Sequence, residues 1–296
     1  MSHSSLNLPP FLQALKEAGK INKTVDPKSD FSFRIGGKIL GGKDPVYIAG
    51  PCSVENKQML FESASKIINA GCDALRAGAY KPCTYPVKEE INGWKEGTRE
   101  FGLELLKEIK DKTNLQIVSE VMNASQLEKS YESIDIIQVG TRNFQNYTLL
   151  DELSKQNKPV LLKRGTWATL EEILGALERL SSHNLNKIAV CLRGVIGAPP
   201  YRHLYASTRW QPDLMMILAI KEVSSVPVIY DPSHATGKRS FVSKISQGAI
   251  ACGADGLIIE AHPNPPKSIS DPDQAIGFDE LSQIVKNCNN IVRAVS

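Results

Sequence analysis

Metal-ligating side chains follow the ends of several apolar segments in this 296-residue sequence. The apolar segment 226–230 runs directly into DPSHATGKR, residues 231–239, and similar segments precede Cys52 and end at Glu260. A thiolate, an imidazole and a carboxylate suit a divalent ion such as Mn²⁺, Fe²⁺, Co²⁺ or Zn²⁺. A lone cysteine or histidine is more often a core or hydrogen-bonded residue, so this prediction depends on a fold that brings them together. The candidate metal ligands are Cys52, His234, Glu260 and Asp271.

Cationic side chains follow the ends of other apolar segments. A single lysine or arginine is usually solvated, but several of them in one partly dry cleft would repel each other unless an anion neutralised them. Phosphate and carboxylate groups fit these side chains best, so the expected ligand is a compact polyanion. A metal beside such a cradle favours a reaction that joins a phosphorylated acid to a carbonyl compound, with the metal polarising the carbonyl oxygen. The five cations are Arg76, Lys81, Arg142, Lys163 and Arg193.

A repeating alternation of strand and helix patterns would position these residues. Eight short runs rich in β-branched residues occupy 45–50, 72–78, 115–120, 134–140, 159–165, 187–194, 226–231 and 255–260. Helical periodicity follows at 57–69, 100–110, 170–180 and 213–222, with Ser53 and Thr169 as examples of preceding capping residues. Nearly continuous apolar strands need cover on both faces, which favours parallel pairing with crossover helices.

Eight such units predict an α/β fold, the closed (β/α)₈ or TIM barrel, whose chemistry gathers at the carboxyl ends of the strands. In a closed barrel the eighth strand neighbours both the seventh and the first, so Cys52, His234 and Glu260 would share one arc. The alternative is an open doubly wound sheet. A dinucleotide-binding fold is disfavoured because no GxGxxG follows any strand.

The first 40 residues stand outside this alternation. Residues 6–19 have the pattern of a short helix, and 31–42 read as two brief strands around a Gly-Gly turn. We expect a hairpin that plugs the bottom of the barrel. The predicted organisation is therefore an N-terminal extension over residues 1–40 and a catalytic barrel over 41–296.

Composition restricts the class of protein. The net charge of +3 is too small, and the lysines too scattered, to predict a nucleic-acid partner. No apolar run approaches the roughly 18 residues needed to cross a membrane, and the N-terminus lacks the pattern of a signal peptide. The six cysteines contain no CxxC pair, which predicts mostly reduced core thiols rather than disulfides or a zinc finger. A cytoplasmic protein without a membrane partner is expected.

Nine stretches along the chain resemble, in the same order, the class I 3-deoxy-D-arabino-heptulosonate 7-phosphate (DAHP) synthases, and more broadly the superfamily they share with 3-deoxy-manno-octulosonate 8-phosphate synthase. The resemblance covers roughly residues 33 to 285. The stretches are AGPCSVE (49–55), LRAGAYKP (75–82), SEVMN (119–123), QVGTRNFQN (138–146), LLKRG (161–165), CLRG (191–194), DPSHATGKR (231–239), GADGLIIEAHPNP (253–265) and SDPDQ (270–274).

The resemblance implies a metal-dependent transferase that condenses phosphoenolpyruvate with erythrose 4-phosphate and water, releasing phosphate, as the first step of the shikimate pathway to aromatic amino acids. It implies that Cys52, His234, Glu260 and Asp271 bind the metal, whose identity stays open. The same resemblance makes Lys81, Cys52 and His234 catalytic, with Lys81 also a proton donor. Members are commonly dimers or tetramers, so a homo-oligomer is expected. The implied substrate-binding residues are Arg76, Lys81, Thr84, Arg142, Lys163 and Arg193.

One departure concerns the aldose phosphate. The heptulosonate enzymes carry Lys-Pro-Arg-Thr where this chain has Lys81-Pro82-Cys83-Thr84, so the arginine that grips the phosphate of erythrose 4-phosphate is missing. Loss of one charge-assisted hydrogen bond weakens such a contact by roughly ten- to a hundredfold. Lys88 or Lys95 in the next loop are alternative cations, although exposed loop lysines are as common. The proline-rich loop 195–210 is also unusual for the family.

Three functions remain open on the sequence alone. The first is a heptulosonate phosphate synthase with a rebuilt phosphate grip. The second is a related ulosonate synthase that uses another aldose or aldose phosphate, although the Lys-Ala-Asn-Arg-Ser run usual in octulosonate synthases is absent too. The third is a non-catalytic relative that binds ligand, which retention of all the candidate ligands and cations disfavours.

Overall fold

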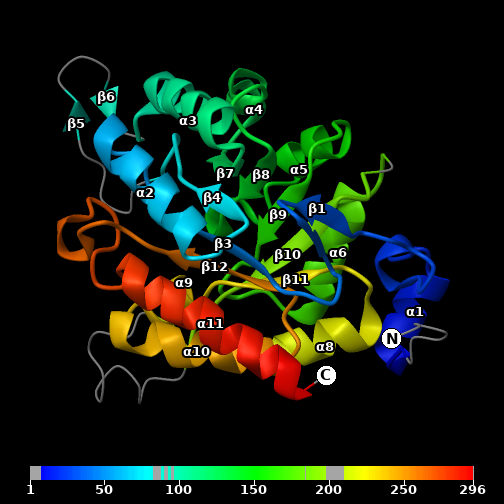
Figure 1. Ribbon diagram of the computed structural model, residues 1–296. Helices are drawn as coiled ribbons and strands as arrows, with labels where there is room; N and C mark the ends of the chain where they lie inside the picture. The colour runs from blue at the N-terminus through cyan, green and yellow to red at the C-terminus, as the bar shows by residue number, and fades with distance from the viewer. Residues whose placement is uncertain are drawn as a thin grey trace.

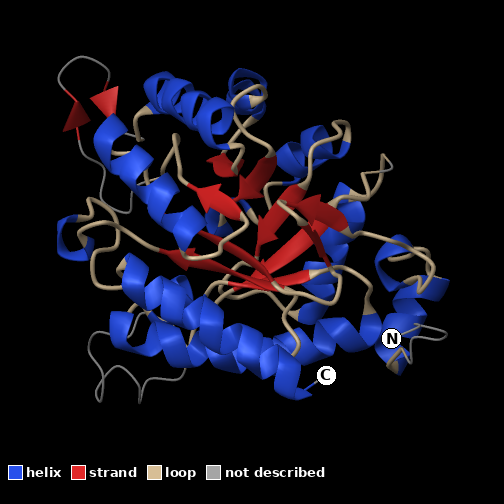
Figure 2. Cartoon of the chain, viewed as in Figure 1, coloured by secondary structure: helices blue, strands red, loops and turns tan. Residues whose placement is uncertain are grey.

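A closed barrel of eight parallel strands forms the centre of the molecule in a computed structural model, which describes residues 8–82, 88–89, 93–94, 97–183, 185–197 and 210–295 (Figure 1). The strands follow the order β10-β11-β12-β3-β4-β7-β8-β9 around the barrel, and helices surround them (Figure 2). This confirms the predicted (β/α)₈ barrel, including closure between the last strand and the first. The strands are β3 (Val46–Gly50), β4 (Ala74–Arg76), β7 (Gln116–Val121), β8 (Ile136–Val139), β9 (Val160–Lys163), β10 (Ile188–Leu192), β11 (Val228–Tyr230) and β12 (Gly256–Glu260).

The helices that cover the barrel bury apolar faces against it. All four helices predicted between strands are present, two with the predicted bounds and two shifted by one to three residues at their ends. Thr169 begins α6 with a complete capping box, as expected. Ser53 does not cap α2: Asn56 does, and its side chain accepts from the Met59 backbone N–H at 2.9 Å. The helices are α1 (Pro10–Glu17), α2 (Lys57–Asn69), α3 (Arg99–Thr113), α4 (Ala124–Ser130), α5 (Tyr147–Ser154), α6 (Leu170–Leu180), α8 (Met215–Val223), α9 (Pro232–Thr236), α10 (Arg239–Ala251) and α11 (Phe278–Val295).

An N-terminal hairpin closes the amino-terminal end of the barrel. Its strands β1 (Phe33–Ile35) and β2 (Lys38–Leu40) pair antiparallel, as predicted. Phe33, Ile35 and Leu40 are buried in one cluster with the inward-facing residues of the barrel strands, among them Val46 and Ile258. The opposite, carboxyl-terminal end is therefore the end left for chemistry.

The segment before the hairpin packs along the outside of the barrel. Leu12 of α1 is buried in a cluster with Leu174 of α6 and Val223 of α8. The short 3₁₀ helix η1 (Lys23–Val25) is fixed by Glu178 of α6, whose carboxylate accepts from the backbone N–H groups of residues 23 and 24 at 3.0 Å each. The division into an extension over 1–40 and a barrel over 41–296 stays a prediction.

Four further short elements lie in loops. The strands β5 (Lys88–Glu89) and β6 (Gly93–Trp94) form a small antiparallel pair, and η2 (Thr141–Asn143) and η3 (Pro265–Lys267) are 3₁₀ turns. In the described part of the chain, none of the helices is long and apolar enough to cross a membrane.

Candidate metal centre and anion cradle

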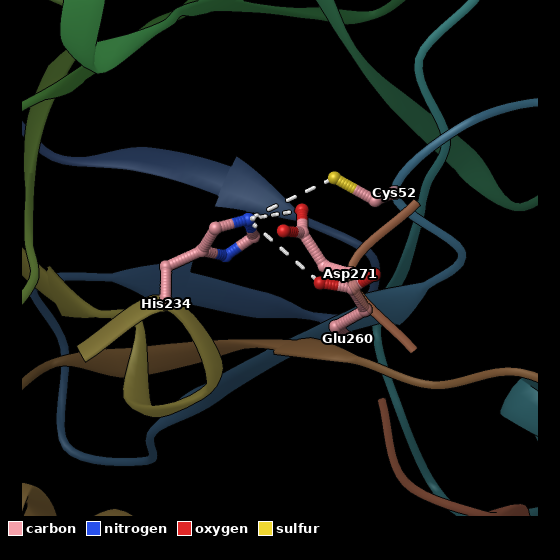
Figure 3. Close-up of side chains that lie close together, drawn as sticks. All are labelled: Cys52, His234, Glu260 and Asp271. Carbon is pink, nitrogen blue, oxygen red and sulfur yellow. Dashed lines mark hydrogen bonds and ion pairs between the residues drawn. The ribbon is translucent and has the colours of Figure 1, made fainter. Parts of the chain in front are cut away.

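Four candidate ligands meet at the carboxyl-terminal end of three adjacent strands (Figure 3). Cys52 lies two residues beyond β3, Glu260 ends β12, and His234 lies in α9, directly after β11. Strand β12 pairs with β3 on one side and with β11 on the other, which brings residues from both ends of the chain together. Asp271 reaches the group from the loop after β12.

The spacing of these side chains fits a metal ion. One ligand atom from each residue lies within 4.8 Å of the others. His234 Nε2 is 3.7 Å from Cys52 Sγ, from Glu260 Oε2 and from Asp271 Oδ2. A tetrahedral ion with bonds of about 2.0–2.3 Å separates its ligand atoms by roughly 3.3–3.8 Å. In addition, Glu260 Oε1 is buried with no hydrogen-bond partner in the described part of the chain, as expected of an atom that awaits a cation.

Asp231 fixes the orientation of His234. It caps α9 by accepting from the His234 backbone N–H at 2.9 Å, and its other carboxylate oxygen lies 2.9 Å from His234 Nδ1. Burial would lower the pKa of His234, but Asp231 raises it to about 9. Gly237 ends the short helix in the left-handed region, at φ 63°, which glycine adopts without strain. The Asp231 contact at Nδ1 leaves Nε2 facing the other ligands. At metal-bound histidines a carboxylate commonly holds the ring in this way, through the nitrogen that does not bind the metal.

Cys52 is held as a thiolate by its neighbours. Burial would raise the pKa of this thiol, but Lys81 and Arg76 hold it well below its usual value. Lys81 Nζ lies 2.5 Å from the sulfur. The bend before Cys52 requires Gly50, because a Cβ there would lie 2.3 Å from the backbone oxygen of Arg76. A thiolate is the form of cysteine that binds metals.

Glu260 is buried deeply and oriented by one amide. Gln274 Nε2 donates to Glu260 Oε2 at 2.7 Å. Burial and the nearby Cys52 raise the pKa of Glu260 to about 8. A carboxylate in such a place is costly without a compensating cation, which a bound metal would supply.

The five predicted cations differ in their surroundings. Arg76 is 3 % exposed, and its Nε and Nη2 have no hydrogen-bond partner in the described part of the chain. Lys163 is buried in an ion pair with Asp231. Arg193 is also buried, donates to the His234 carbonyl at 3.0 Å and lies 5.5 Å from the Trp210 ring.

The two remaining cations lie toward the rim. Lys81 is half-buried beside Cys52, and that thiolate together with Glu120 raises the pKa of Lys81 above its usual value in spite of burial. Arg142 is exposed and donates to the Pro82 carbonyl at 3.1 Å, next to Lys81. The structure thus brings the cradle and the ligand group into one site, with Arg142 on its outer edge.

Sequence reasoning missed the acids of the cradle. Asp231 was expected only to end a strand, yet it contacts both Lys163 and His234. Glu120, at the end of β7, is buried where it interacts with Lys81 and Lys163, and burial raises its pKa. Both acids directly follow or end predicted strands, and that position was the available signal. They offset part of the repulsion among the cations.

Other expectations fall elsewhere. Thr84 and Cys83 lie outside the described residues, as do most of the loop 195–210 and the side chains of Lys88 and Lys95. Arg164, next to Lys163, is not in the cradle: its Nη1 pairs with Asp213 Oδ2 at 2.5 Å, and its remaining donors reach the Ala168 carbonyl.

Comparison with known proteins identifies the family. The model of the DAHP synthetase I family matches residues 20–295. A phospho-2-dehydro-3-deoxyheptonate aldolase of Thermotoga maritima is 37% identical over 284 residues, which cover 96% of this chain and 80% of that protein. A 2-dehydro-3-deoxyphosphooctonate aldolase of Geobacter sulfurreducens is 25% identical over 271 residues, covering 87% of this chain and 96% of that protein.

Solved structures agree with the sequence matches. The crystal structure of the Thermotoga maritima DAHP synthase matches with a TM-score of 0.81 and 37% identity, over 90% of this chain and 74% of that one. A truncated form of that enzyme matches with a TM-score of 0.79 and 36% identity, over 90% of this chain and 94% of that one. On the family match, the identity and the shared fold, the chain belongs to the DAHP synthetase I family.

Proposed function

We propose that the protein is a metal-dependent synthase that condenses phosphoenolpyruvate with erythrose 4-phosphate and water, giving 3-deoxy-D-arabino-heptulosonate 7-phosphate and phosphate. The observation that carries this proposal is the burial of the Arg76 guanidinium next to the candidate metal ligands. This guanidinium has two donors, Nε and Nη2, without a hydrogen-bond partner among the described residues, and it lies beside a four-residue metal-ligating group. A buried charge with unused donors is costly, so the site favours an anionic substrate next to the ion.

The cradle would bind phosphoenolpyruvate. Arg76 and Lys163 end two strands, Arg193 directly follows a third, and all three carry donors suited to phosphate and carboxylate oxygens. Asp231 pairs with Lys163, and Glu120 also interacts with Lys163, so these acids offset part of the repulsion among the cations. Phosphoenolpyruvate bound by these cations would lie beside the metal-ligating group, where its methylene carbon could meet the second substrate.

The metal site would serve the second substrate. Cys52, His234, Glu260 and Asp271 are the proposed ligands, and their donor set suits Mn²⁺, Fe²⁺, Co²⁺ or Zn²⁺. When bound, the ion supplies a Lewis acid that polarises the aldehyde oxygen of the aldose. In the condensation a bond would form between the methylene carbon of phosphoenolpyruvate and the aldehyde carbon, and water would add at the enol carbon. The bond between that carbon and the phosphate oxygen would break, so that one proton of water leaves with phosphate and the other replaces the proton given to the aldehyde oxygen.

Lys81 would supply the proton that the aldehyde oxygen gains. Its raised pKa keeps it protonated near neutral pH, and its Nζ lies 2.5 Å from the Cys52 sulfur, within the ligand group. A proton donor has to stand within hydrogen-bond reach of the oxygen that it protonates. The proposed catalytic residues are therefore Lys81, Cys52 and His234.

A related reaction with a different aldose is the second candidate. Cys83 replaces the arginine that would grip the aldose phosphate, and octulosonate-phosphate aldolases are also among the relatives of this chain. Thr84 and Arg142 stay predicted substrate-binding residues at this end of the site. The predicted cytoplasmic location and homo-oligomeric state stay predictions too.

The test is phosphate release from phosphoenolpyruvate by metal-reconstituted protein across a panel of aldoses and aldose phosphates. We expect release with erythrose 4-phosphate and none without an aldose. Activity with another sugar alone would assign the second candidate instead, and no release with any sugar or metal would favour a non-catalytic binding protein. Arg179→Met, an arginine paired with Asp151 on the outer helices, is the control for Arg76→Met, which should raise the KM for phosphoenolpyruvate.

A further inference from the structure

The loop between β12 and α11 delivers Asp271 in an unfavourable backbone conformation. Asp271 has φ 54°, one of three non-glycine residues with positive φ in the described part of the chain. Aspartate tolerates this left-handed region better than most residues, but the conformation persists only where surrounding contacts enforce it. The loop must therefore be held from outside.

Arg239, the first residue of α10, makes three hydrogen bonds to the part of the loop that follows Asp271. Its Nε donates to the Ala275 carbonyl at 2.5 Å and its Nη2 to the Pro272 carbonyl at 3.0 Å. Its backbone N–H donates to the Asp273 carbonyl at 2.8 Å. These contacts account for the last cation of DPSHATGKR.

A second contact holds the part of the loop that precedes Asp271. Glu55 Oε1 accepts from the Ile269 backbone N–H at 3.0 Å and lies 3.3 Å from His262 Nε2. His262 Nδ1 accepts from the Asn264 backbone N–H at 2.9 Å. The loop is thus fixed on both sides of the strained residue.

The same loop also orients a second ligand. Gln274, between the carbonyls that Arg239 binds, donates through Nε2 to Glu260 Oε2 at 2.7 Å. Its backbone N–H closes a turn onto the Asp271 carbonyl at 3.2 Å. A shift of this loop would therefore displace Asp271 and release Glu260 together.

We propose that Arg239 is a positioning residue that preorganises the metal site by clamping residues 272–275. The inference rests on the proposed metal site, since it assumes that Asp271 and Glu260 bind the ion. Among the described residues, the Arg239 hydrogen bonds go to the loop carbonyls and not to the ligand atoms or the cradle. Its effect on metal binding should pass through Asp271 and Gln274.

The test is metal affinity, measured with Co²⁺ in the absence of substrates. Arg239→Ala should raise the Kd for Co²⁺ by about tenfold, the range seen when outer contacts of metal ligands are removed. Arg239→Lys, which can keep one of the two side-chain bonds, should show a smaller increase, and added guanidinium ion should partly restore Arg239→Ala. Arg179→Ala, which removes a similar two-bond arginine contact far from the loop, should leave the Kd unchanged.

A double-mutant cycle separates positioning from general destabilisation. Asp271→Asn keeps a residue that tolerates positive φ but weakens the ligand. In that background Arg239→Ala should change the Kd by less than about threefold, because most of the coupling has been removed. The Co²⁺ visible spectrum of Arg239→Ala should shift toward that of Asp271→Asn, while the thiolate charge-transfer band from Cys52 persists.

The outcomes distinguish this inference from the proposed function. An unchanged Kd and spectrum in Asp271→Asn would contradict the metal site itself. A raised Kd for Co²⁺ in Asp271→Asn, together with an unchanged Kd in Arg239→Ala, would overturn only the proposed role of Arg239. Equal effects of Arg239→Ala in both backgrounds would also overturn it, since Arg239 would then act on overall stability.

Discussion

At the scale of single residues, Asp231 links the two halves of the site. One carboxylate is shared between Lys163 of the cradle and His234 of the ligand group. Burial would raise the pKa of Asp231, but His234 and Lys163 hold it well below its usual value, so the group stays ionised. The anion cradle and the metal site are therefore coupled through one buried acid.

The variant Asp231→Asn should weaken both metal binding and phosphoenolpyruvate binding. An amide cannot match the charge of Lys163, and it no longer favours a proton on His234 Nδ1. We therefore expect metal affinity to fall by about ten- to a hundredfold and the Kd for phosphoenolpyruvate to rise. Titration calorimetry with metal and with phosphoenolpyruvate measures both. Asp255→Asn is the control. Asp255 is also a buried acid paired with a lysine, and it accepts from the Val228 backbone N–H, but it lies at the opposite end of the barrel. Equal losses of metal affinity in both variants would contradict this role.

His234→Ala should abolish metal binding and turnover, because His234 Nε2 is the atom within 3.7 Å of the other three ligands. Metal content after reconstitution and dialysis, measured by atomic emission, checks this. His183 lies between α6 and β10, and its side chain is hydrogen-bonded to Ser154 of α5. The variant His183→Ala should therefore retain full metal content. Normal metal content in His234→Ala would remove His234 from the ligand set.

At the scale of elements, strand ends were predictable and loop geometry was not. The alternation of apolar runs and helical patterns located all eight strands. Barrel strands are buried on both faces, so they appear in the sequence as nearly continuous apolar runs. The positions of side chains beyond the strand ends depend on each loop. For example, η2 begins after a single residue, Gly140, beyond β8 and leaves Arg142 exposed at the rim. The carbonyls that bind Arg239 lie more than 30 residues away in sequence, so no local pattern could indicate them.

The attachment of η1 to α6 gives a prediction at this scale. Glu178 accepts from two backbone N–H groups and from the Thr24 hydroxyl at 2.8 Å. Glu178→Ala leaves these donors unpartnered, so we expect the free energy of unfolding to fall by about 2 kcal/mol. Urea denaturation measures it, and Glu171→Ala, an exposed acid on the same helix, should change stability far less.

The Glu178 contribution should also depend on pH. Burial would raise the pKa of Glu178, but the backbone bonds from η1 lower it below its usual value of 4.5. A lowered folded-state pKa stabilises the protein fully above the unfolded value and loses that stabilisation as pH falls through the folded-state pKa. The stability difference between Glu178→Ala and the unchanged protein should therefore shrink in acid, and a difference that grew below pH 4.5 would contradict it.

At the scale of the whole molecule, barrel closure creates the site. Glu260 lies opposite Gly50 in the pairing of β12 with β3, so the last strand delivers a carboxylate beside the cysteine that follows the first barrel strand. The hairpin fills the other end, and chemistry is left to one face. Family membership and this geometry together support a single reaction, in which the cradle holds phosphoenolpyruvate and the ligand group holds a metal against an aldehyde.

The most direct test of that account is mass spectrometry of the product formed from phosphoenolpyruvate and erythrose 4-phosphate. Metal-reconstituted protein should form one acid whose mass equals the two substrates plus water minus phosphoric acid, and metal-stripped protein should form none until metal is restored. Phosphate release without this condensed acid, or equal product from stripped and reconstituted protein, would contradict metal-dependent condensation.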